Sequence, residues 1–284
     1  MRRFMPEAGP LHKFLLGLVI VVGIAPLGYF VSVETGIAEA TPAPVVDTVV
    51  TADPIGRYVD NLAFGVGEKL TFDVNYGFIN AGTATMEVRR LIEWQGRPCY
   101  QIVTRARSSG FFSTIYPVED SIESIMDAMG LFSWRFTKKL REGSYRADRQ
   151  YSFDQREHFV VYHDSTYSLA PYVQDAISTF YYVRTQPLEV GKPVFVDAFV
   201  DGRKMRMEVK VHRKERVKVE AGTFDCFVVE PMTEAVGVFK HEGRLTVWVT
   251  DDRVHMPVKM KSKLAVGSIT VELTDFQLGE LADF

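Results

Sequence analysis

The sequence predicts a mainly β protein, either a large antiparallel curved sheet or an open β-barrel, built from two similar halves with one covering α-helix. Three observations predict this fold. Short runs rich in Val, Ile, Phe, Tyr and Thr alternate with polar residues and end at Gly, Asn or Asp, which is typical of strands joined by tight turns. The second half of the chain repeats landmarks of the first, and one segment between the halves shows helical spacing instead.

The composition is that of an ordinary globular protein. The 284 residues are 46% hydrophobic and 24% charged, which excludes disorder for most of the chain. The formal net charge of -3 gives no overall attraction to phosphate backbones, so no nucleic-acid binding is expected.

The N-terminus predicts export. Arg2, Arg3 and Lys13 precede an uncharged run over 14–33, and a small-x-small cleavage sequence follows at 38–40. Residues 1–40 are therefore either a signal peptide or an N-terminal membrane anchor, because a hydrophobic helix of about 20 residues can span a bilayer. In both cases the chain beyond them is periplasmic, either soluble or tethered to the inner membrane. Residues 41–63 are expected to be a linker.

Twelve strands are expected in a single β domain over 64–279. The first half, 64–153, contains 70–76, 82–91, 99–106, 118–126, 132–140 and 145–153, and the second half, 188–279, contains 194–200, 204–219, 224–229, 244–250, 256–264 and 268–276. Short turns such as Asp201-Gly202 point to antiparallel meanders. So many strands need closure or a covering layer, because long exposed edges invite aggregation.

The internal repeat has offsets near 124 positions. Val66-Gly67-Glu68-Lys69 recurs as Val190-Gly191-Lys192-Pro193 at an offset of 124. Gly82 matches Gly202 at an offset of 120, as loop-length differences would allow. The chain is therefore interpreted as one β-rich half used twice.

The connector over 154–187 has no counterpart in the repeat, so a specific function is expected there first. Within it, apolar residues at helical spacing predict a helix over 173–184 that covers or plugs the concave side of the sheet. This helix either closes the core by packing or lines a pocket mouth, where Arg184 would offer a charged fork to an anionic head group. On the second interpretation the candidate ligand-binding residues are Tyr162, Tyr167, Tyr172, Phe180, Tyr181, Tyr182 and Arg184.

A run of basic residues alternates with other residues along the expected strand 204–219. On a regular strand, this alternation places all of them on one face. The face is either an ordinary solvated side of a half-buried strand or a surface for anionic lipid head groups. The basic residues are Lys210, His212, Lys214, Arg216 and Lys218.

The two cysteines, Cys99 and Cys226, occupy matching places in the two halves at an offset of 127. An exported protein can form a disulfide between them, provided that the halves bring equivalent strands together. The alternative is two buried thiols on core strands.

No catalytic, metal or cofactor signature occurs in the sequence. It has no H-E-x-x-H, no paired C-x-x-C and no G-x-S-x-G. Asp251 and Asp252 form a carboxylate pair, but they lie in a turn composition, and the matching residues of the first half are Asp127 and Ala128. We therefore expect no enzyme activity, no catalytic or metal-binding residues and no cofactor.

Several motifs together carry a family resemblance. They are Val66-Gly67-Glu68-Lys69-Leu70, Ala81-Gly82-Thr83-Ala84, DAISTFYYVR at 175–184, AGTFDC at 221–226, VWVTDD at 247–252 and Met256-Pro257-Val258. Over about residues 62–279 the chain resembles the bacterial exported-protein family known as domain of unknown function 3108. The resemblance implies a mostly β domain of the cell envelope and gives no activity and no functional residues. In fold alone the chain is also similar to periplasmic lipoprotein carriers, in which a helical lid covers the apolar cavity of an open barrel.

Two functional hypotheses follow. In the first, the protein is an exported cell-envelope protein that binds a lipid or another apolar or amphipathic envelope molecule without catalysis. In the second, it is an envelope assembly or scaffolding protein that binds other proteins through a sheet edge or its basic face. Residues 14–33 would contact the membrane if they are not cleaved.

Overall fold

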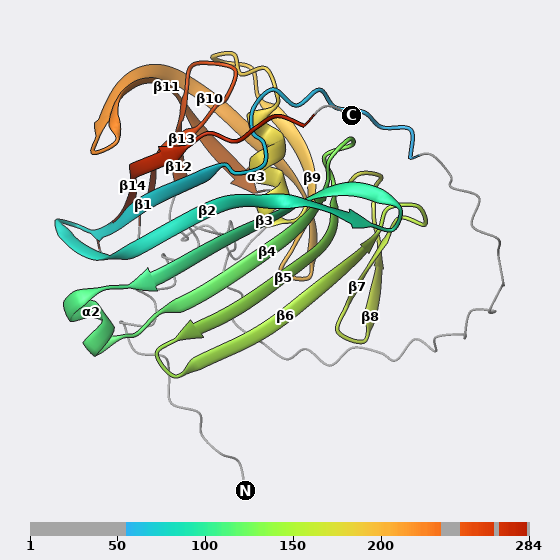
Figure 1. Cartoon of the computed structure of the whole chain (residues 1–284), viewed down its shortest axis with the longest axis horizontal. Helices are drawn as coiled ribbons and strands as arrows, with labels where there is room; N and C mark the ends of the chain where they lie inside the picture. Colours follow the sequence, from blue (N-terminus) through green and yellow to red (C-terminus); the bar gives the residue numbers. More distant parts are fainter. Residues whose placement is uncertain (1–54, 234–244, 264–266, 283–284) are drawn as a thin grey trace, which may run out of the picture.

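A computed structural model describes residues 55–233, 245–263 and 267–282 of the chain (Figure 1). The expected signal peptide or anchor at 1–40 and most of the linker at 41–63 lie outside these residues. Within the described ranges, no helix has the length and apolar character needed to cross a membrane.

Fourteen strands form one antiparallel sheet, which confirms the mainly β class and an open form of the sheet. The strands are β1 (Lys69–Tyr76), β2 (Ile79–Trp94), β3 (Arg97–Ser108), β4 (Glu119–Asp127), β5 (Ser133–Glu142), β6 (Tyr145–Asp154), β7 (Phe159–Tyr162), β8 (Ser165–Ser168), β9 (Val194–Val200), β10 (Arg203–Val219), β11 (Gly222–Thr233), β12 (Leu245–Thr250), β13 (Pro257–Lys263) and β14 (Ser268–Gln277). Their order is β8-β7-β6-β5-β4-β3-β2-β1-β14-β13-β12-β11-β10-β9, so β1 joins the two halves by pairing with β14. In the described chain, the end strands β8 and β9 are not paired with each other, and the sheet curls without closing (Figure 1).

The strands form where the sequence alternates. In β1, Leu70, Phe72 and Val74 are buried on one face, while the residues between them are only partly buried. All twelve expected strands are present, with ends shifted by a few residues. The hairpin of β7 and β8 and the short helix α2 (Gly110–Ile115) were not predicted, because segments of four to six residues are too short to show a period.

The two halves share conformational details as well as strand order. Gly67 and Gly191 have φ angles of 87° and 84°, which favour glycine, and their N–H groups donate at 2.8 Å to the carbonyl oxygens of Val88 and Val211. A bulge follows each of these valines, one between β2 and β3 and the other between β10 and β11. The predicted match of Gly82 with Gly202 was wrong, because Gly82 lies inside β2 whereas Gly202 lies in the β9–β10 turn. The real offset thus stays near 124 through this region.

The bulge in β10 divides the expected basic stripe. Lys210 precedes the shift in register and His212 lies at it, whereas Lys214, Arg216 and Lys218 follow it. After the shift, Lys214 pairs with Phe227 of the main core, and its Nζ lies 4.5 Å from the centre of that ring. The prediction of five basic side chains on one face was therefore wrong, because one extra residue moves all following side chains to the opposite face.

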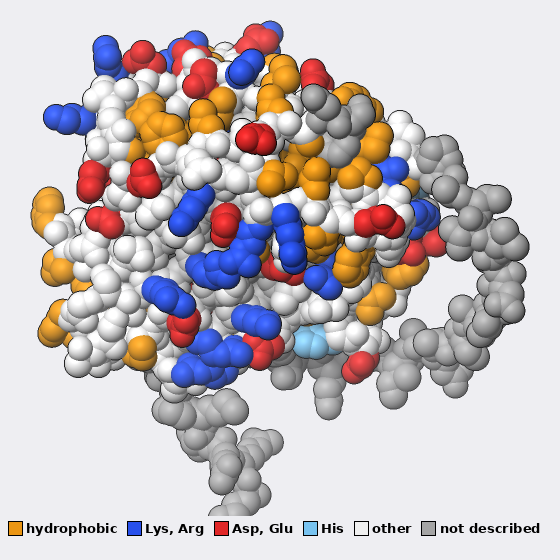
Figure 2. All heavy atoms as spheres, viewed as in Figure 1, with side chains coloured by type: hydrophobic (Ala, Val, Ile, Leu, Met, Phe, Trp, Pro, Cys, Tyr) orange, Lys and Arg blue, Asp and Glu red, His pale blue; other side chains and the backbone are white. Residues whose placement is uncertain are grey.

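Lys and Arg side chains instead gather with acidic ones over β3 to β6 in the view of Figure 2. Arg135 lies 3.0 Å from Glu123, and Arg141 lies 2.8 Å from Asp148. Half-exposed ion pairs of this kind are typical of the solvated face of a sheet.

The cysteines lie in two separate apolar clusters outside the main core. Cys99 packs with Ile125, Phe132 and Trp134, and Cys226 packs in the corresponding cluster of the second half. Both are free and buried, so the bridge considered from the sequence does not form. The strands that carry them, β3 and β11, are separated in the sheet by β2, β1, β14, β13 and β12.

Candidate functional site

The helix α3 (Ala176–Arg184) lies across the concave side of the sheet, between the two halves (Figure 1). It starts three residues later than predicted, at a capping box. The N–H groups of Ile177 and Ser178 donate to Oδ1 of Asp175 at 2.7 and 2.8 Å, and the Asp175 N–H donates to the Ser178 hydroxyl at 2.8 Å. This reciprocal pairing satisfies amide groups that a helix start leaves open.

Asp175 also fastens the helix to the first half of the sheet. Its Oδ2 accepts hydrogen bonds from the hydroxyls of Ser124 on β4 at 2.6 Å and Ser133 on β5 at 2.5 Å. Burial raises the pKa of Asp175, and these hydrogen bonds oppose that rise by stabilising the ionised form. The beginning of α3 is thus fixed in position by a buried side-chain network.

The end of α3 is fastened by a buried ion pair to Glu68, the residue before β1. Nη1 and Nη2 of Arg184 each donate to one carboxylate oxygen of Glu68 at 2.7 Å, and Nη2 also donates to the Ala63 carbonyl at 3.1 Å. Arg184 is 1% exposed and Glu68 is fully buried. The guanidinium of Arg184, which was expected to be offered to an anionic head group, is thus already paired with a carboxylate of the same chain.

A largely apolar hollow lies between α3 and the second half of the sheet. The helix contributes Thr179, Phe180, Val183 and Arg184. The other lining residues are Leu188, Met207, Val209, Val229, Pro231, Leu245, Val247, Val249, His255 and Met260. The hollow has a cavity volume of about 40 Å³, within about 560 Å³ of space that is continuous with solvent. Most of the concave side is thus filled by side chains, and the hollow is a shallow apolar site.

The polar groups at the inner end of this hollow already have partners within the protein. Nδ1 of His255 donates to the Arg184 carbonyl at 2.8 Å, and burial lowers the pKa of His255. Arg184 is held by Glu68, as described above. No side chain in this described part of the hollow therefore presents an unpaired charge to a ligand.

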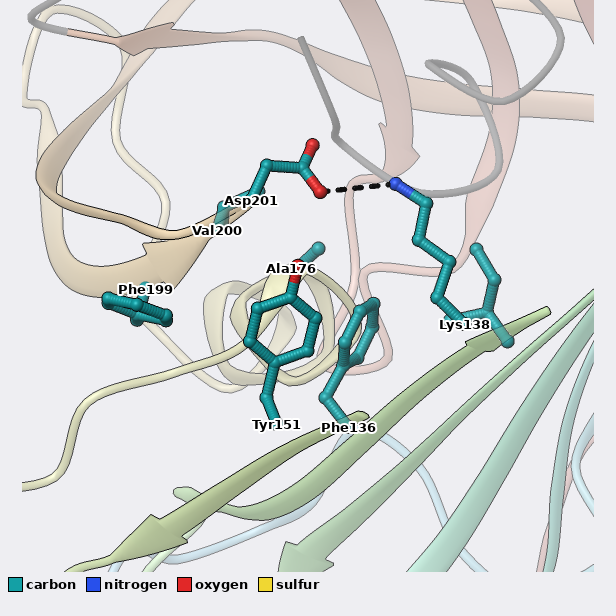
Figure 3. A pocket seen from close by; sticks show the side chains of 8 residues that line it. Phe136, Lys138, Tyr151, Ala176, Phe199, Val200 and Asp201 are labelled. Carbon is teal, nitrogen blue, oxygen red and sulfur yellow. Dashed lines mark hydrogen bonds and ion pairs between the residues drawn. The ribbon is translucent and has the colours of Figure 1, made fainter. Parts of the chain in front are cut away.

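A smaller cavity lies between the start of α3, strands β4 to β6 of the first half and the end of β9 (Figure 3). Phe136, Tyr151 and Phe199 enclose it, and Nζ of Lys138 lies 3.3 Å from a carboxylate oxygen of Asp201 at its margin. Its water-accessible space is about 10 Å³, which is close to the minimum for one water molecule. It is too small for an organic ligand.

Two carboxyl groups lie near this cavity, on the inward faces of β4 and β5. Asp120 and Glu142 are both buried, and one oxygen of Asp120 accepts from the Arg141 N–H at 2.8 Å. Burial, together with the neighbouring Asp120, raises the pKa of Glu142 to about 8, while Lys138 opposes the rise. These surroundings favour the protonated form of Glu142, which sequence patterns could not indicate.

The candidate aromatic residues are divided among different places. Tyr162 stacks on Tyr151 with ring centres 4.2 Å apart, and Tyr167 lies 5.3 Å from Phe199. Arg57 lies over the rings of both Tyr172 and Tyr182, 4.9 Å from each centre, whereas Tyr181 is buried against Phe64. Of the seven candidate residues, Phe180 and Arg184 line the apolar hollow.

Sequence reasoning missed the residues on the sheet side of the hollow. Met207, Val229, Val247 and Met260 come from β10, β11, β12 and β13. Their alternation predicted buried faces, but nothing in the pattern distinguishes a buried face that packs fully from one that leaves space.

In the residues described here, no group of three or more His, Cys, Asp and Glu side chains is arranged to hold a metal ion. The Asp251–Asp252 pair lies in a turn, where Asp252 Oδ1 accepts from the N–H groups of Val254 and His255 at 2.9 and 3.1 Å. Asp251 lies 2.7 Å from Lys214. Both carboxylates thus have local structural partners.

Comparison with known sequences assigns the chain to a family. The profile of the family described as "Protein of unknown function (DUF3108)" matches residues 71–274, which is most of the chain. The protein belongs to this DUF3108 family. No match was found among curated proteins.

Solved structures with a similar fold include a β-barrel-like protein of the domain of unknown function DUF1849 from Brucella abortus. It has a TM-score of 0.55 at 11% identity, covering 77% of this chain and 100% of that one. A predicted lipoprotein from Parabacteroides distasonis has a TM-score of 0.35 at 11% identity, covering 78% of this chain and 99% of that one. A predicted exported protein with a YmcC-like fold from Bacteroides fragilis has a TM-score of 0.33 at 12% identity, with coverage of 78% and 99%. The Brucella abortus structure supports the fold of this DUF3108 protein and carries no argument about its function.

Proposed function

We propose that this protein is an exported, non-enzymatic binding module that holds the apolar part of an amphipathic envelope molecule in the hollow between α3 and the second half of the sheet. The observation that carries the proposal is the lining of the hollow, where apolar side chains of one helix and four strands converge. Concave sites lined in this way favour the transfer of apolar groups from water. The N-terminal positive residues and apolar run support an exported location.

The engaged charges indicate which part of the ligand enters the hollow. Arg184 is paired with Glu68, and His255 is buried with a lowered pKa, so the inner end offers no free charge to an ionic head group. An ionic group placed there would lose its hydration without compensation. The ligand would therefore insert its hydrocarbon part and leave its polar part at the open side. Its bound chain would be short or partly exposed, because little of the space is enclosed.

Titration with a fluorescent fatty acid, 11-(dansylamino)undecanoic acid, tests this proposal. Val183→Trp adds bulk at the half-buried helix wall of the hollow, and Val161→Trp adds the same bulk on the exposed side of β7 as a matched control. We expect the first variant to bind the probe at least about tenfold more weakly, because a filled hollow loses the apolar contact area that binds the chain. Equal binding by both variants, with melting temperatures like that of the wild type, would contradict the proposal.

A second candidate function rests on the open ends of the sheet. β9 pairs with β10 on one side, and on its other side the described chain contributes only Gln174, which bridges to Ala198. A strand with a free edge can receive a strand from a partner protein, which is the geometry of a scaffolding protein. Cross-linking from position 195 in intact cells would give discrete protein adducts in this case and none if β9 remains unpartnered.

A further inference from the structure

Four large apolar side chains project into solvent at one end of the sheet. Phe78 and Ile79 lie at the β1–β2 turn, and Phe111 and Ile115 lie on α2; we call these four residues the apolar rim. Phe78 is 107% exposed and Phe111 is 72% exposed, and α2 has no buried residue. Exposure on this scale contributes nothing to the core and marks an interaction surface when the residues are contiguous.

The two elements of the apolar rim are held side by side. The N–H of Ser109, which precedes α2, donates to the Ala81 carbonyl of β2 at 3.1 Å, and its hydroxyl donates to Asn80 Oδ1 at 3.0 Å. Figure 2 shows apolar side chains projecting from the left margin, where Figure 1 places the β1–β2 turn and α2. The rim is therefore one convex apolar surface built on two anchored loops.

The apolar rim lies at the same end of the sheet as one end of the hollow. Leu245 of the hollow pairs with Ser262, which pairs with Ile269. Ile269 pairs with Tyr76, and Tyr76 pairs with Ile79 of the rim. This row of partners crosses five adjacent strands, so a surface bound by the rim would face the end of the hollow at which Leu245 lies.

Basic side chains lie on the elements on both flanks of the rim. Arg107, at the end of β3, is 64% exposed and lies 2.7 Å from Glu119. Arg146 is exposed beside the β5–β6 turn, where its Nη1 donates to the carbonyl of Gly143 at 2.8 Å. On the other flank, Lys261 and Lys263 are exposed on β13, whose end pairs with the first residues of β14. Arg107 is paired with Glu119, so the remaining exposed cations of this set are Arg146, Lys261 and Lys263.

We propose that the apolar rim inserts into the surface of an anionic phospholipid bilayer, with the flanking cations against the head groups. A bilayer fits a convex apolar projection, because it deforms around the inserted side chains, whereas a rigid protein partner needs a matching groove. Phenylalanine side chains bury in the acyl boundary, and lysine and arginine are attracted to anionic lipids. This contact is separate from ligand binding in the hollow and can hold if that function fails.

Site-specific fluorescence in the full chain tests the proposal without interference from residues 14–33, which could themselves bind lipid. The native thiols are buried, so a thiol-reactive NBD label reports on an introduced cysteine. Phe78→Cys and Phe111→Cys place it on the rim, and Phe195→Cys on the exposed side of β9 is the matched control. Vesicles contain phosphatidylcholine with or without phosphatidylglycerol, together with a doxyl-labelled lipid as quencher.

With phosphatidylglycerol present, we expect quenching at positions 78 and 111 to be at least about threefold greater than at position 195. The difference should shrink in phosphatidylcholine alone, because the flanking cations then lose their partners. Equal quenching at all three positions would mean that the N-terminal segment alone holds the protein at the membrane, and this result would overturn the proposal. Labels at 78 and 111 that are shielded before lipid is added would overturn it in favour of self-association through the rim.

Discussion

Removing one partner of the buried Arg184–Glu68 pair should destabilise the protein strongly. In Glu68→Gln, the guanidinium keeps its buried position and loses both its countercharge and one of the two 2.7 Å hydrogen bonds. Breaking a buried pair in this way costs about 3–5 kcal/mol, because an uncompensated charge remains in the core. For a folded region of this size, that cost corresponds to a fall in melting temperature of roughly 6–20 °C.

The double variant separates the energy of the pair from the cost of an unpaired charge. Arg184→Met alone leaves the Glu68 carboxylate buried without its countercharge and should destabilise the protein by a similar amount. Arg184→Met combined with Glu68→Met removes both charges and should recover most of the lost stability.

Chemical unfolding followed by far-ultraviolet circular dichroism supplies the measurement. We expect the coupling free energy from the double-mutant cycle to be at least about 2 kcal/mol. Single variants that each cost less than about 1 kcal/mol, or costs that add in the double variant, would refute the reasoning that this pair is desolvated and mutually dependent.

Three further outcomes are expected. The pKa of Glu142 is raised from 4.5 to about 8, so between these pH values the folded state binds a proton that the unfolded state releases. The free energy of unfolding should therefore fall by roughly 1.4 kcal/mol per pH unit over this range. Glu142→Gln should reduce this fall, as measured by urea titrations at several pH values. A slope that the substitution leaves unchanged would assign the effect to another group. Asp175→Ala should lower the free energy of unfolding by about 3 kcal/mol in the same titrations, because two helix amides and two buried hydroxyls lose their acceptor. A loss below about 1 kcal/mol would show that these four hydrogen bonds do not stabilise the fold together. Burial raises the pKa of Cys226 to about 12 and also raises that of Cys99, so neither thiol should react with DTNB until urea unfolds the chain; rapid reaction of the native protein would show that these outer clusters open.

Features that depend on local sequence could be predicted. The strands follow from alternation, and α3 follows from its apolar spacing with Asp175 as its start signal. The helix was also correctly placed against the concave side, because a sheet with one apolar face must be covered there.

Features that depend on contacts between distant parts of the chain could not be predicted from the sequence. Arg184 meets Glu68 from 116 positions away, so its apparent freedom at the end of a helix was misleading. The cysteines match in the repeat, but the halves join through β1 and β14, which puts five strands between the strands that carry them. One bulge residue in β10 changed the faces of three basic side chains, and a bulge has no reliable sequence signal.

The junction of the two halves has a consequence for how the chain acquires its structure. Lys69 pairs with Gln277, so the central seam of the sheet joins strands near opposite ends of the folded region. Until β14 is available, β1 is an open edge, and the first half alone exposes the backbone groups that the seam would satisfy. Pairing across such a long stretch of chain is slow, because the entropy of closing the loop is lost before the contacts between the strands stabilise it. A chain truncated before β14 should therefore aggregate through β1, and chaperones that shield strand edges would act on this protein before its last strand arrives.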